Sequence, residues 1–380
     1  MKRILTLALA SALALPALAH AEKGSPLWLR HQQISPDGSQ IAFCYKGDIY
    51  TVPTAGGQAL RLTSNAAYDG TPIWSPDSRS LAFSSDREGS KDVYIVKADG
   101  SGLRRLTYSS EKEVPVAFLD GSTLLFQSYV MPDVKDGMYP WDWFVQTYSL
   151  DLSKTIARPK LYGAYPMLMP SLRGGEILYT DVKGYEDIWR KHAISPVTRD
   201  IWLRSKDGKH TKLTTFGGED RNAVWDSKGG FYYLSEREGS FNVYHRDAAA
   251  AAAADKKITS FTKDPVRFLS IASNGTLCYG FDGEIYTQTP GGQPTKVNVS
   301  IVRDQEESAI NPETIRDGVS SFAVAPSNKE IAFIVHGDVF VTHTEYGTTK
   351  RLTSTPEEER DVDFSNDGKK IVYAAERNGG

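Results

Sequence analysis

Several kinds of residue and segment are scarce in this sequence, and each scarcity argues against a class of function. Only two cysteines occur among the 380 residues, too few for a disulfide framework or a cysteine–histidine zinc site. The formal net charge is −3, and Lys and Arg are scattered without a block of like charge. The charge therefore gives no case for binding nucleic acid or an anionic membrane. Beyond the N-terminal region, no apolar run is long enough to span a membrane.

The sequence motifs of common catalytic sites are also absent. There is no Gly-x-Ser-x-Gly, no His-Glu-x-x-His, no phosphate-binding loop and no Gly-x-Gly-x-x-Gly that opens a helix. Asp133, Asp136 and Asp142 could be imagined as a calcium cluster, but their spacing matches no known calcium loop, and a solvated loop face explains them better. We therefore expect this chain to hold no catalytic residues, no metal and no cofactor.

The N-terminus has the pattern of a secretory signal peptide over residues 1–21. Lys2 and Arg3 form the basic start, residues 4–18 are apolar, and Ala19-His20-Ala21 supplies a small-x-small cleavage site. A single transmembrane anchor is the alternative, but the apolar run is short for a span, which needs ~18–20 residues. We expect cleavage after Ala21, with Ala19 as a second cleavage site. The mature protein is then exported, free of the membrane, and periplasmic in a Gram-negative host.

A phrase made of a turn, a strand, an acidic turn, a second strand and a short tail recurs along the chain. The first copy reads Ser35-Pro36-Asp37-Gly38, Ile41-Ala42-Phe43, Gly47-Asp48-Ile49-Tyr50 and Arg61-Leu62-Thr63. A second copy begins about 40 residues later at Ser75-Pro76-Asp77, and weaker copies end at residues 212–214, 257–259 and 351–353. A strand-rich repeat of this period is the signature of a β-propeller with one repeat per four-stranded blade. The turn residues are explained by the turns they build, not by acid–base chemistry.

Counting the copies predicts an all-β chain with a six-bladed β-propeller followed by the first one to two blades of a second, incomplete β-propeller. The predicted boundaries are 27–300 for the first propeller, 301–317 for a polar spacer, and 318–380 for the start of the second. A single eight-bladed propeller is the alternative, but the spacer and the broken last repeat argue against it. Because open blade edges are normally paired or protected, we expect this chain to be a fragment of a longer protein.

Two cysteines and an alanine run belong to the repeat pattern. Cys44 and Cys278 lie in apolar strand patterns, which favours two small buried side chains; a disulfide is the alternative, because their blades would be neighbours in a six-bladed ring. The seven alanines of residues 248–254 favour helix but are too few for a stable one, so we interpret them as an exposed connector.

Two insertions interrupt the repeat, over residues 130–143 and 183–199. The first is rich in Pro, Met, Tyr and Trp, which indicates a structured loop rather than disorder. The second combines aromatic and basic residues that could form a pocket rim or anchor a peptide carboxylate. Its candidate substrate-binding residues are Trp189, Arg190, Lys191, His192 and Arg199. In the alternative interpretation Trp189 covers a blade edge, and the basic groups face water or pair with Glu186 and Asp187.

Longer phrases of the sequence resemble the tricorn-type proteases of bacteria. They are Lys-Gly-Tyr-Glu-Asp-Ile-Trp-Arg-Lys-His (183–192), Thr-Arg-Asp-Ile-Trp (198–202), Gly-Gly-Glu-Asp-Arg-Asn (217–222), Pro-Val-Arg-Phe-Leu (265–269) and Asn-Gly-Thr-Leu-Cys-Tyr-Gly (274–280). The resemblance covers essentially the whole mature chain. It implies a six-bladed propeller, then a seven-bladed one, a PDZ-like module and a serine-protease core, in a large homo-oligomer that degrades peptides. None of the family's catalytic residues carries over, because their region is expected beyond Gly380.

We therefore expect the non-catalytic propeller region of an exported, tricorn-like serine peptidase. Its partners would be peptides or unfolded polypeptide and the C-terminal PDZ-like and protease domains of the parent chain, with a role in gating or guiding substrate and in supporting assembly. The alternative is a stand-alone, TolB-like periplasmic propeller that binds proteins. TolB-type proteins carry a separate α/β domain before the propeller, whereas here the signal peptide runs almost directly into the first repeat, which favours the first hypothesis.

Overall fold

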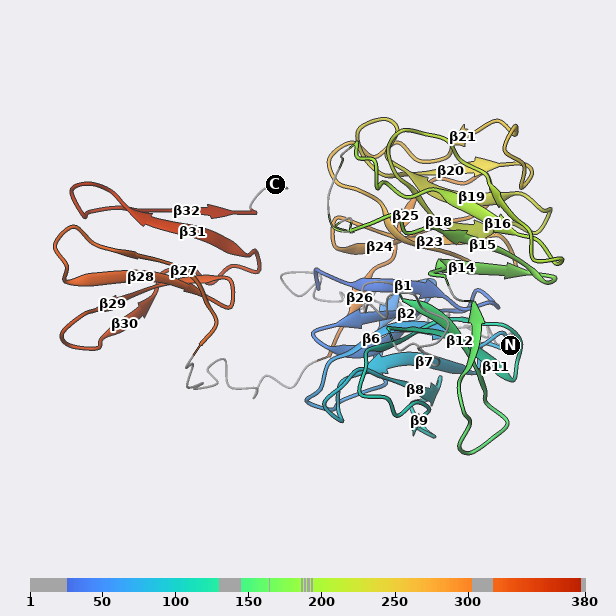
Figure 1. The fold of residues 1–380 in the computed structure, drawn as a ribbon, viewed down its shortest axis with the longest axis horizontal. Helices are drawn as coiled ribbons and strands as arrows, with labels where there is room; N and C mark the ends of the chain where they lie inside the picture. The colour runs from blue at the N-terminus through green and yellow to red at the C-terminus, as the bar shows by residue number, and fades with distance from the viewer. Residues whose placement is uncertain are drawn as a thin grey trace, which may run out of the picture. The chain divides into compact units, whose positions relative to one another are not determined.

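The computed structural model describes residues 26–129, 145–163, 165–185, 187, 189, 192, 194–302 and 317–376. These residues form β-strands joined by turns and loops, and they contain no helix (Figure 1). Accordingly, nothing in the described ranges has the helical length and apolarity that crossing a bilayer requires. The chain divides into two compact units, residues 1–302 and residues 303–380, and most of the predicted spacer lies outside the described residues.

The first half of unit 1 forms three antiparallel sheets of four strands each, in chain order. The first sheet comprises β1 (Arg30–Ile34), β2 (Gln40–Tyr45), β3 (Asp48–Pro53) and β5 (Leu60–Arg61). The second comprises β6 (Asp69–Trp74), β7 (Ser80–Ser85), β8 (Asp92–Lys97) and β9 (Arg104–Arg105). The third comprises β10 (Glu113–Phe118), β11 (Thr123–Ser128), β12 (Gln146–Asp151) and β13 (Lys160–Gly163).

The second half repeats this arrangement, so the described part of unit 1 holds six four-stranded sheets. The fourth sheet comprises β14 (Leu168–Arg173), β15 (Glu176–Thr180), β16 (Ile201–Arg204) and β17 (His210–Lys212). The fifth comprises β18 (Asp220–Trp225), β19 (Phe231–Ser235), β20 (Asn242–Arg246) and β21 (Lys256–Lys257). The sixth comprises β22 (Arg267–Ile271), β23 (Leu277–Phe281), β24 (Glu284–Gln288) and β25 (Thr295–Lys296).

The turn that opens each repeat is built as its residue types require. In the first copy, Asp37 Oδ1 accepts hydrogen bonds from the backbone N of Ser39 (2.9 Å) and from the Ser35 hydroxyl, and Gly38 has φ +76°. Asp77 caps the turn of the second copy in the same way. These hydrogen bonds hold the pKa of both carboxyls below its ordinary value. The aspartates therefore have the structural role that the repeat predicts.

The strands after these turns are buried on both faces. On β2, Ile41 and Phe43 pack in a cluster with Cys278 of the sixth sheet, whereas Ala42 and Cys44 pack in a cluster with the second sheet. The core is therefore a series of apolar layers, each between two neighbouring sheets. Burying an aromatic or branched side chain of this size contributes about 1.5–3 kcal/mol to stability. Both cysteines are buried free thiols in different layers, which matches the prediction of two small core residues.

The first and sixth sheets lie side by side and close unit 1 into a ring (Figure 1). The inner strands β1 and β22 are neighbours, and Ile34 N donates to Ser270 Oγ at 3.1 Å. β26 (Val299–Ser300) also returns to β4 (Gly57–Gln58), which lies between β3 and β5 in the chain, and the two form a separate parallel pair. Consecutive inner strands β1, β6, β10, β14, β18 and β22 also contact one another, so each sheet lies between two others.

The ring closure gives a testable position at Gly56. Its φ is +87°, and a Cβ built there would lie 2.8 Å from the backbone O of Asn298, next to β26. We expect Gly56→Ala to lower the free energy of unfolding by about 1–3 kcal/mol more than the control Gly291→Ala, because overpacking against a fixed backbone is costly. Gly291 has φ +73° and open space around it, so the control carries only the backbone strain. If both variants lose the same free energy of unfolding in urea titrations, close packing between Gly56 and Asn298 is contradicted.

The inner strands share a feature that the sequence pattern did not indicate. Five of them carry a non-glycine residue with φ between +49° and +55°: His31, Thr71, Met169, Asn222 and Phe268. In each of these strands the pairing with the next strand shifts register around that residue, which is the geometry of a β-bulge. The bulges lie near the ends of the strands that begin at Arg30, Asp69, Leu168, Asp220 and Arg267. We call this end of the ring, where inner strands begin, the loop end.

Unit 2 repeats the blade pattern on its own. Its four-stranded sheet comprises β27 (Val319–Val324), β28 (Glu330–Val335), β29 (Asp338–His343) and β30 (Thr349–Arg351), and it packs on β31 (Glu359–Phe364) and β32 (Ile371–Ala375). The other face of the four-stranded sheet bears Phe322, which is 68% exposed, and the stacked pair Phe333 and Phe340. The corresponding pair in unit 1, Phe43 and Tyr50, is buried.

Candidate functional site at the loop end

The insertion after β15 is tied down at its base. Lys183 forms an ion pair with Asp200 and donates a hydrogen bond to the backbone O of Thr198. Asp181 accepts hydrogen bonds from Asp200 N at 2.7 Å and from Trp202 Nε1 at 2.9 Å. The two ends of the insertion, which leave β15 and enter β16 at the loop end, are therefore held together. We call the insertion, residues 183–199, the strap.

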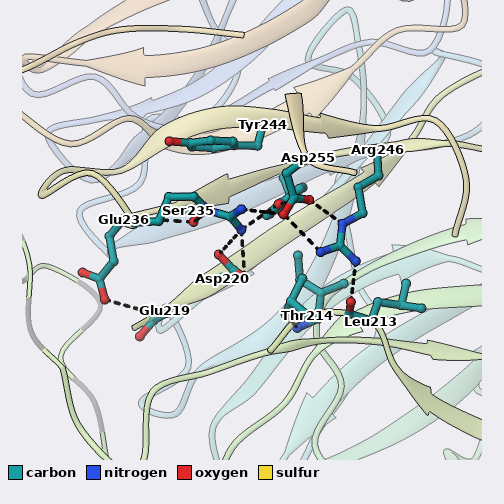
Figure 2. Close-up of polar contacts among 12 residues, drawn as sticks. Leu213, Thr214, Glu219, Asp220, Ser235, Glu236, Tyr244, Arg246 and Asp255 are labelled. Atoms are coloured by element: carbon teal, nitrogen blue, oxygen red, sulfur yellow. Dashed lines mark hydrogen bonds and ion pairs between the residues drawn. The ribbon is translucent and has the colours of Figure 1, made fainter. Parts of the chain in front are cut away.

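Two of the predicted site residues, Arg199 and His192, join a buried ionic cluster beneath the strap. Arg199 Nη1 lies 3.1 Å from Glu219 Oε1, and Arg221 Nη1 lies 3.2 Å from the same oxygen. Glu236 Oε1 accepts a hydrogen bond from Glu219 N at 2.7 Å (Figure 2), and Glu236 Oε2 lies 3.3 Å from His192 Nδ1. Both carboxylates are fully buried. Because each has a cationic or donor partner, this cluster attaches the strap to the fifth sheet.

Trp189, the third predicted residue, reaches across the loop end. Its indole lies 5.0 Å from the guanidinium of Arg30 on β1 and 5.2 Å from that of Arg267 on β22. It also packs edge-on against Phe268 at 5.8 Å, and its backbone O accepts a hydrogen bond from Arg267 Nη2. The side chain is still 41% exposed. The indole of Trp28, which is 49% exposed, lies 5.5 Å from the same Arg30 guanidinium.

Several cationic groups lie around these aromatic residues, with Asp187 and Asp264 among the nearby carboxylates. Burial, followed by the nearby charges of Arg30 and Lys91, lowers the pKa of His31 to about 4, so its imidazole is neutral at pH 7. Burial and the charge of Arg221 lower the pKa of Arg267 to about 10. Burial and Lys91 also lower the pKa of Lys112. Cations that depress one another's pKa values form a region that attracts carboxylates and other anions.

The remaining predicted residues cannot be placed in this way. Arg190 and Lys191 lie outside the described residues, as do the first insertion, residues 130–143, and its aspartates Asp133, Asp136 and Asp142. Among the residues that are described, no group of three or more His, Cys, Asp and Glu side chains could hold a metal ion.

Sequence reasoning missed Arg30, Arg267 and Phe268, although an alignment of the repeats carries a signal for them. The residue directly before the inner-strand bulge is arginine in the first, fifth and sixth sheets, at Arg30, Arg221 and Arg267. This shared position brings Arg30 and Arg267 to Trp189, whereas Arg221 pairs with Glu219 and stacks on Phe241 at 4.1 Å. The position of Trp189 beside two of them depends on the path of the strap, which no periodicity reveals.

The fifth sheet contains a second concentration of charge, and it is structural (Figure 2). Arg237 Nη2 lies 3.3 Å from Asp220 Oδ2, Arg237 Nη1 lies 2.5 Å from Asp255 Oδ2, and the guanidinium stacks on Tyr244 at 4.7 Å. Arg246 pairs with the same Asp255 and donates to the backbone O of Leu213. Burial opposes ionisation of Asp255, but the hydrogen bonds from Arg246, Tyr233 and Arg237 lower its pKa to about 2.

The second sheet contains the same arrangement at the equivalent residues. Arg87 Nη2 lies 2.9 Å from both carboxylate oxygens of Asp69, and its guanidinium stacks on Tyr94 at 4.6 Å. This cluster recurs in two sheets of the ring, and its arginines and aspartates pair with one another. Its role is therefore to stabilise the blade. The candidate site is therefore the cationic and aromatic surface at the loop end.

A closed ring of four-stranded antiparallel sheets, each packed face to face on its neighbours, is a β-propeller. The chain belongs to the family of the tricorn protease N-terminal β-propeller domain, because the model of that family matches residues 26–293. The prediction of an all-β propeller with this family resemblance is confirmed.

Individual relatives agree with this assignment. Tricorn protease homolog 1 of Streptomyces coelicolor is 24% identical over 344 residues, which cover 88% of this chain and 30% of the relative. Putative tricorn protease homolog 2 of the same organism is 23% identical and is covered over 28% of its length. The crystal structure of the tricorn protease superposes with a TM-score of 0.62 at 18% identity, over 92% of this chain and 33% of that one. The chain thus spans about a third of the length of these proteins.

Proposed function

We propose that this chain is the propeller region of an exported, tricorn-like serine peptidase, and that it guides or gates peptides or unfolded polypeptide instead of cutting them. The family match over residues 26–293 carries the proposal, together with the short share of the relatives that the chain covers. In a protein of that length, the catalytic residues would lie in the part that the chain does not cover. The remaining parts would include the PDZ-like and protease domains implied by the sequence resemblance, assembled as a homo-oligomer in the periplasm.

The loop end is the surface we assign to peptide contact. The guanidinium of Arg30 and the exposed faces of Trp28 and Trp189 offer a carboxylate partner and two aromatic platforms within one small area. Arg190 and Lys191 would add to the positive charge of the strap. We assign His192 and Arg199 a supporting role, because each already pairs with a buried glutamate.

Two measurements on the purified 380-residue chain test this proposal. We expect the chain to bind a short peptide without hydrolysing it. The affinity should fall about tenfold when the peptide's C-terminal carboxylate is amidated or when Arg30 is changed to Gln, because a charge-assisted hydrogen bond contributes about 1.5–3 kcal/mol. Isothermal titration calorimetry measures the binding. Arg79→Gln is the matched control, because Arg79 is an exposed arginine in the turn between β6 and β7, at the opposite end of the ring.

The proposal fails in either of two ways. Robust hydrolysis by this chain would show that the chemistry lies within it, and equal binding by the Arg30→Gln and Arg79→Gln variants would remove the loop end from peptide contact. The reading frame that encodes the protein supplies a separate test. A PDZ-like segment and a serine-protease core downstream of residue 380 support the assignment, whereas a stop codon directly after Gly380 contradicts it.

A further inference from the structure

Three inner strands of the ring begin with an acidic residue at the loop end: Asp69 on β6, Glu113 on β10 and Asp220 on β18. Each acid pairs across the sheet with the serine that ends the second strand, and the third strand carries a tyrosine that packs on an aromatic ring of the second. In the third sheet these residues are Ser128, Tyr148 and Phe126. The same set of side chains therefore occurs three times in the ring.

In the second and fifth sheets an arginine completes this set. Arg87 Nη2 lies 2.9 Å from both carboxylate oxygens of Asp69, and Arg87 Nε donates to Ser85 Oγ at 2.9 Å. The same guanidinium lies 4.6 Å from the ring of Tyr94. Arg237 makes the equivalent three contacts in the fifth sheet (Figure 2). The acid, the serine and the tyrosine thus define one position for a guanidinium group.

The third sheet has the acid but lacks the arginine. Valine, Val130, stands at the sequence position that Arg87 occupies in the second repeat. Glu113 is buried, its Oε2 has no hydrogen-bond partner, and among the described residues no ion pair joins it to a cation. The nearby Arg105 is already paired with Asp92 at 2.8 Å. Because a buried carboxylate without a partner is costly, Glu113 takes up a proton or binds a cation from elsewhere.

We propose that the third sheet binds the guanidinium group of an arginine side chain from another polypeptide, which pairs with the Glu113 carboxylate and stacks on the ring of Tyr148. A guanidinium suits this position better than an ammonium group, because its planar fork bonds a carboxylate through two N–H groups and its flat face stacks on an aromatic ring. Glu113 lies at the loop end, the surface assigned to peptide contact. The inference rests on the proposed function for the source of the arginine.

Titration of the 380-residue chain with methylguanidinium chloride at pH 8 tests the site. We expect a saturable rise in melting temperature that exceeds the effect of methylammonium chloride at equal concentration, because a ligand that binds the folded state stabilises it. In the Glu113→Gln chain the apparent affinity should fall about tenfold, because a charge-assisted hydrogen bond is lost. The matched control is Glu111→Gln, a nearby exposed glutamate, which should bind like the parent.

Two outcomes of this titration refute the site. If the parent and the Glu113→Gln chain respond equally, Glu113 does not hold the cation. If methylammonium stabilises the parent as well as methylguanidinium does, the position is not selective for a guanidinium group.

Binding of methylguanidinium should weaken from pH 8 to pH 5. Burial, with the nearby charge of Asp92, raises the pKa of Glu113 to about 7, so its carboxyl is neutral at pH 5 and cannot form an ion pair. Arg105 and Glu88 also act on Asp92, and Tyr148 stays neutral because burial and Glu113 raise its pKa to about 12. Equal affinity at the two pH values would contradict an ion pair with Glu113.

The second sheet supplies a positive control. Arg87→Gln removes the guanidinium that pairs with Asp69. In a chain that carries both Arg87→Gln and Glu113→Gln, methylguanidinium should again raise the melting temperature, because the carboxylate of Asp69 then accepts it. No response in this folded double variant would contradict the equivalence of the two positions. If the double variant does not fold, the comparison of the parent with Glu113→Gln still decides the proposal.

A pair of short peptides tests the source of the guanidinium group. A peptide with one arginine should bind about tenfold more tightly than the same peptide with citrulline, which keeps the shape and loses the charge, and Glu113→Gln should abolish this difference. Equal binding of the two peptides would overturn the assignment to a polypeptide arginine. The methylguanidinium titration contains no peptide. A chain that binds methylguanidinium but no peptide therefore contradicts the proposed function, whereas a chain that binds both peptides equally and no methylguanidinium contradicts this inference alone.

Discussion

Replacing Arg237 by methionine should lower the free energy of unfolding by about 3–5 kcal/mol, because removing one partner of a buried ion pair leaves the other charge uncompensated. Arg237 faces Asp220, whose side chain is fully buried, and it also holds Asp255 and stacks on Tyr244. Methionine keeps much of the apolar packing and removes the charge. Urea unfolding followed by tryptophan fluorescence gives the difference directly.

The pH dependence of this loss identifies its cause. Burial raises the pKa of Asp220 to about 6 even with Arg237 beside it. A carboxyl with a raised folded-state pKa stabilises the fold most when protonated, so its contribution is present at low pH and lost as pH rises. The Arg237→Met variant should therefore lose more stability at pH 8 than at pH 5. The double variant Asp220→Asn, Arg237→Met should recover part of the loss at pH 8, and no recovery would show that Asp220 is not the uncompensated group.

The second large effect concerns Glu113, at the start of β10 between the second and third sheets. Burial, with the nearby charge of Asp92, raises its pKa from 4.5 to about 7. Asp92 is itself buried and pairs with Arg105 at 2.8 Å. Asp69 and Asp220 occupy the position of Glu113 in their own sheets, at the start of the inner strand. Each pairs with an arginine that lies two residues after the second strand, Arg87 or Arg237, whereas the third repeat has Val130 at that position.

Stability should therefore fall as pH rises from about 4.5 to about 7, because the unfolded chain releases the Glu113 proton first. Arg105, which pairs with Asp92, and Glu88 are the other charged groups that act on this pair. We expect Glu113→Gln to be more stable than the parent at pH 8 by roughly 1–3 kcal/mol, a range reduced to allow for solvent screening, and nearly equal to it at pH 4.5.

The measurement is the melting temperature from pH 4.5 to pH 8.5, and the control is Glu111→Gln, a nearby exposed glutamate. The control should follow the parent at every pH. A Glu113→Gln curve that runs parallel to the parent over the whole range would show that Glu113 ionises like an exposed carboxyl.

The repeat predicted those parts of the fold that local chemistry determines. Asp37 and Gly38 form the expected turn, and Ile41 to Cys44 form a strand buried on both faces, because turn preferences and apolar runs act over a few residues. The run of alanines at 248–254 forms turns with no helix, and its ends are held by the Arg246–Asp255 pair. Its composition alone did not indicate that its flanking charges anchor it.

The site was predictable only in part, because its geometry depends on distant segments. Trp189, His192 and Arg199 were selected from one loop, but their partners come from β1, β22, the residue before β18 and the residue after β19. The inner-strand bulges place His31 and Thr71 at positive φ, a conformation that local preference disfavours for β-branched and bulky residues. The packing of the closed ring overrides that preference, and only the assembled ring shows it.

The closure of the first sheet against the sixth has a consequence for how fast the protein folds. The hydrogen bond from Ile34 to Ser270 joins residues 236 positions apart. Because closing a loop restricts the chain, a loop of that length costs about 3 kcal/mol more free energy to close than a ten-residue hairpin. Such contacts form late, since non-local pairing slows folding. Until β22 and β26 arrive, the apolar face of β2 that bears Phe43 has no partner sheet. Folding rate, more than final stability, should therefore be the property most sensitive to changes along this seam.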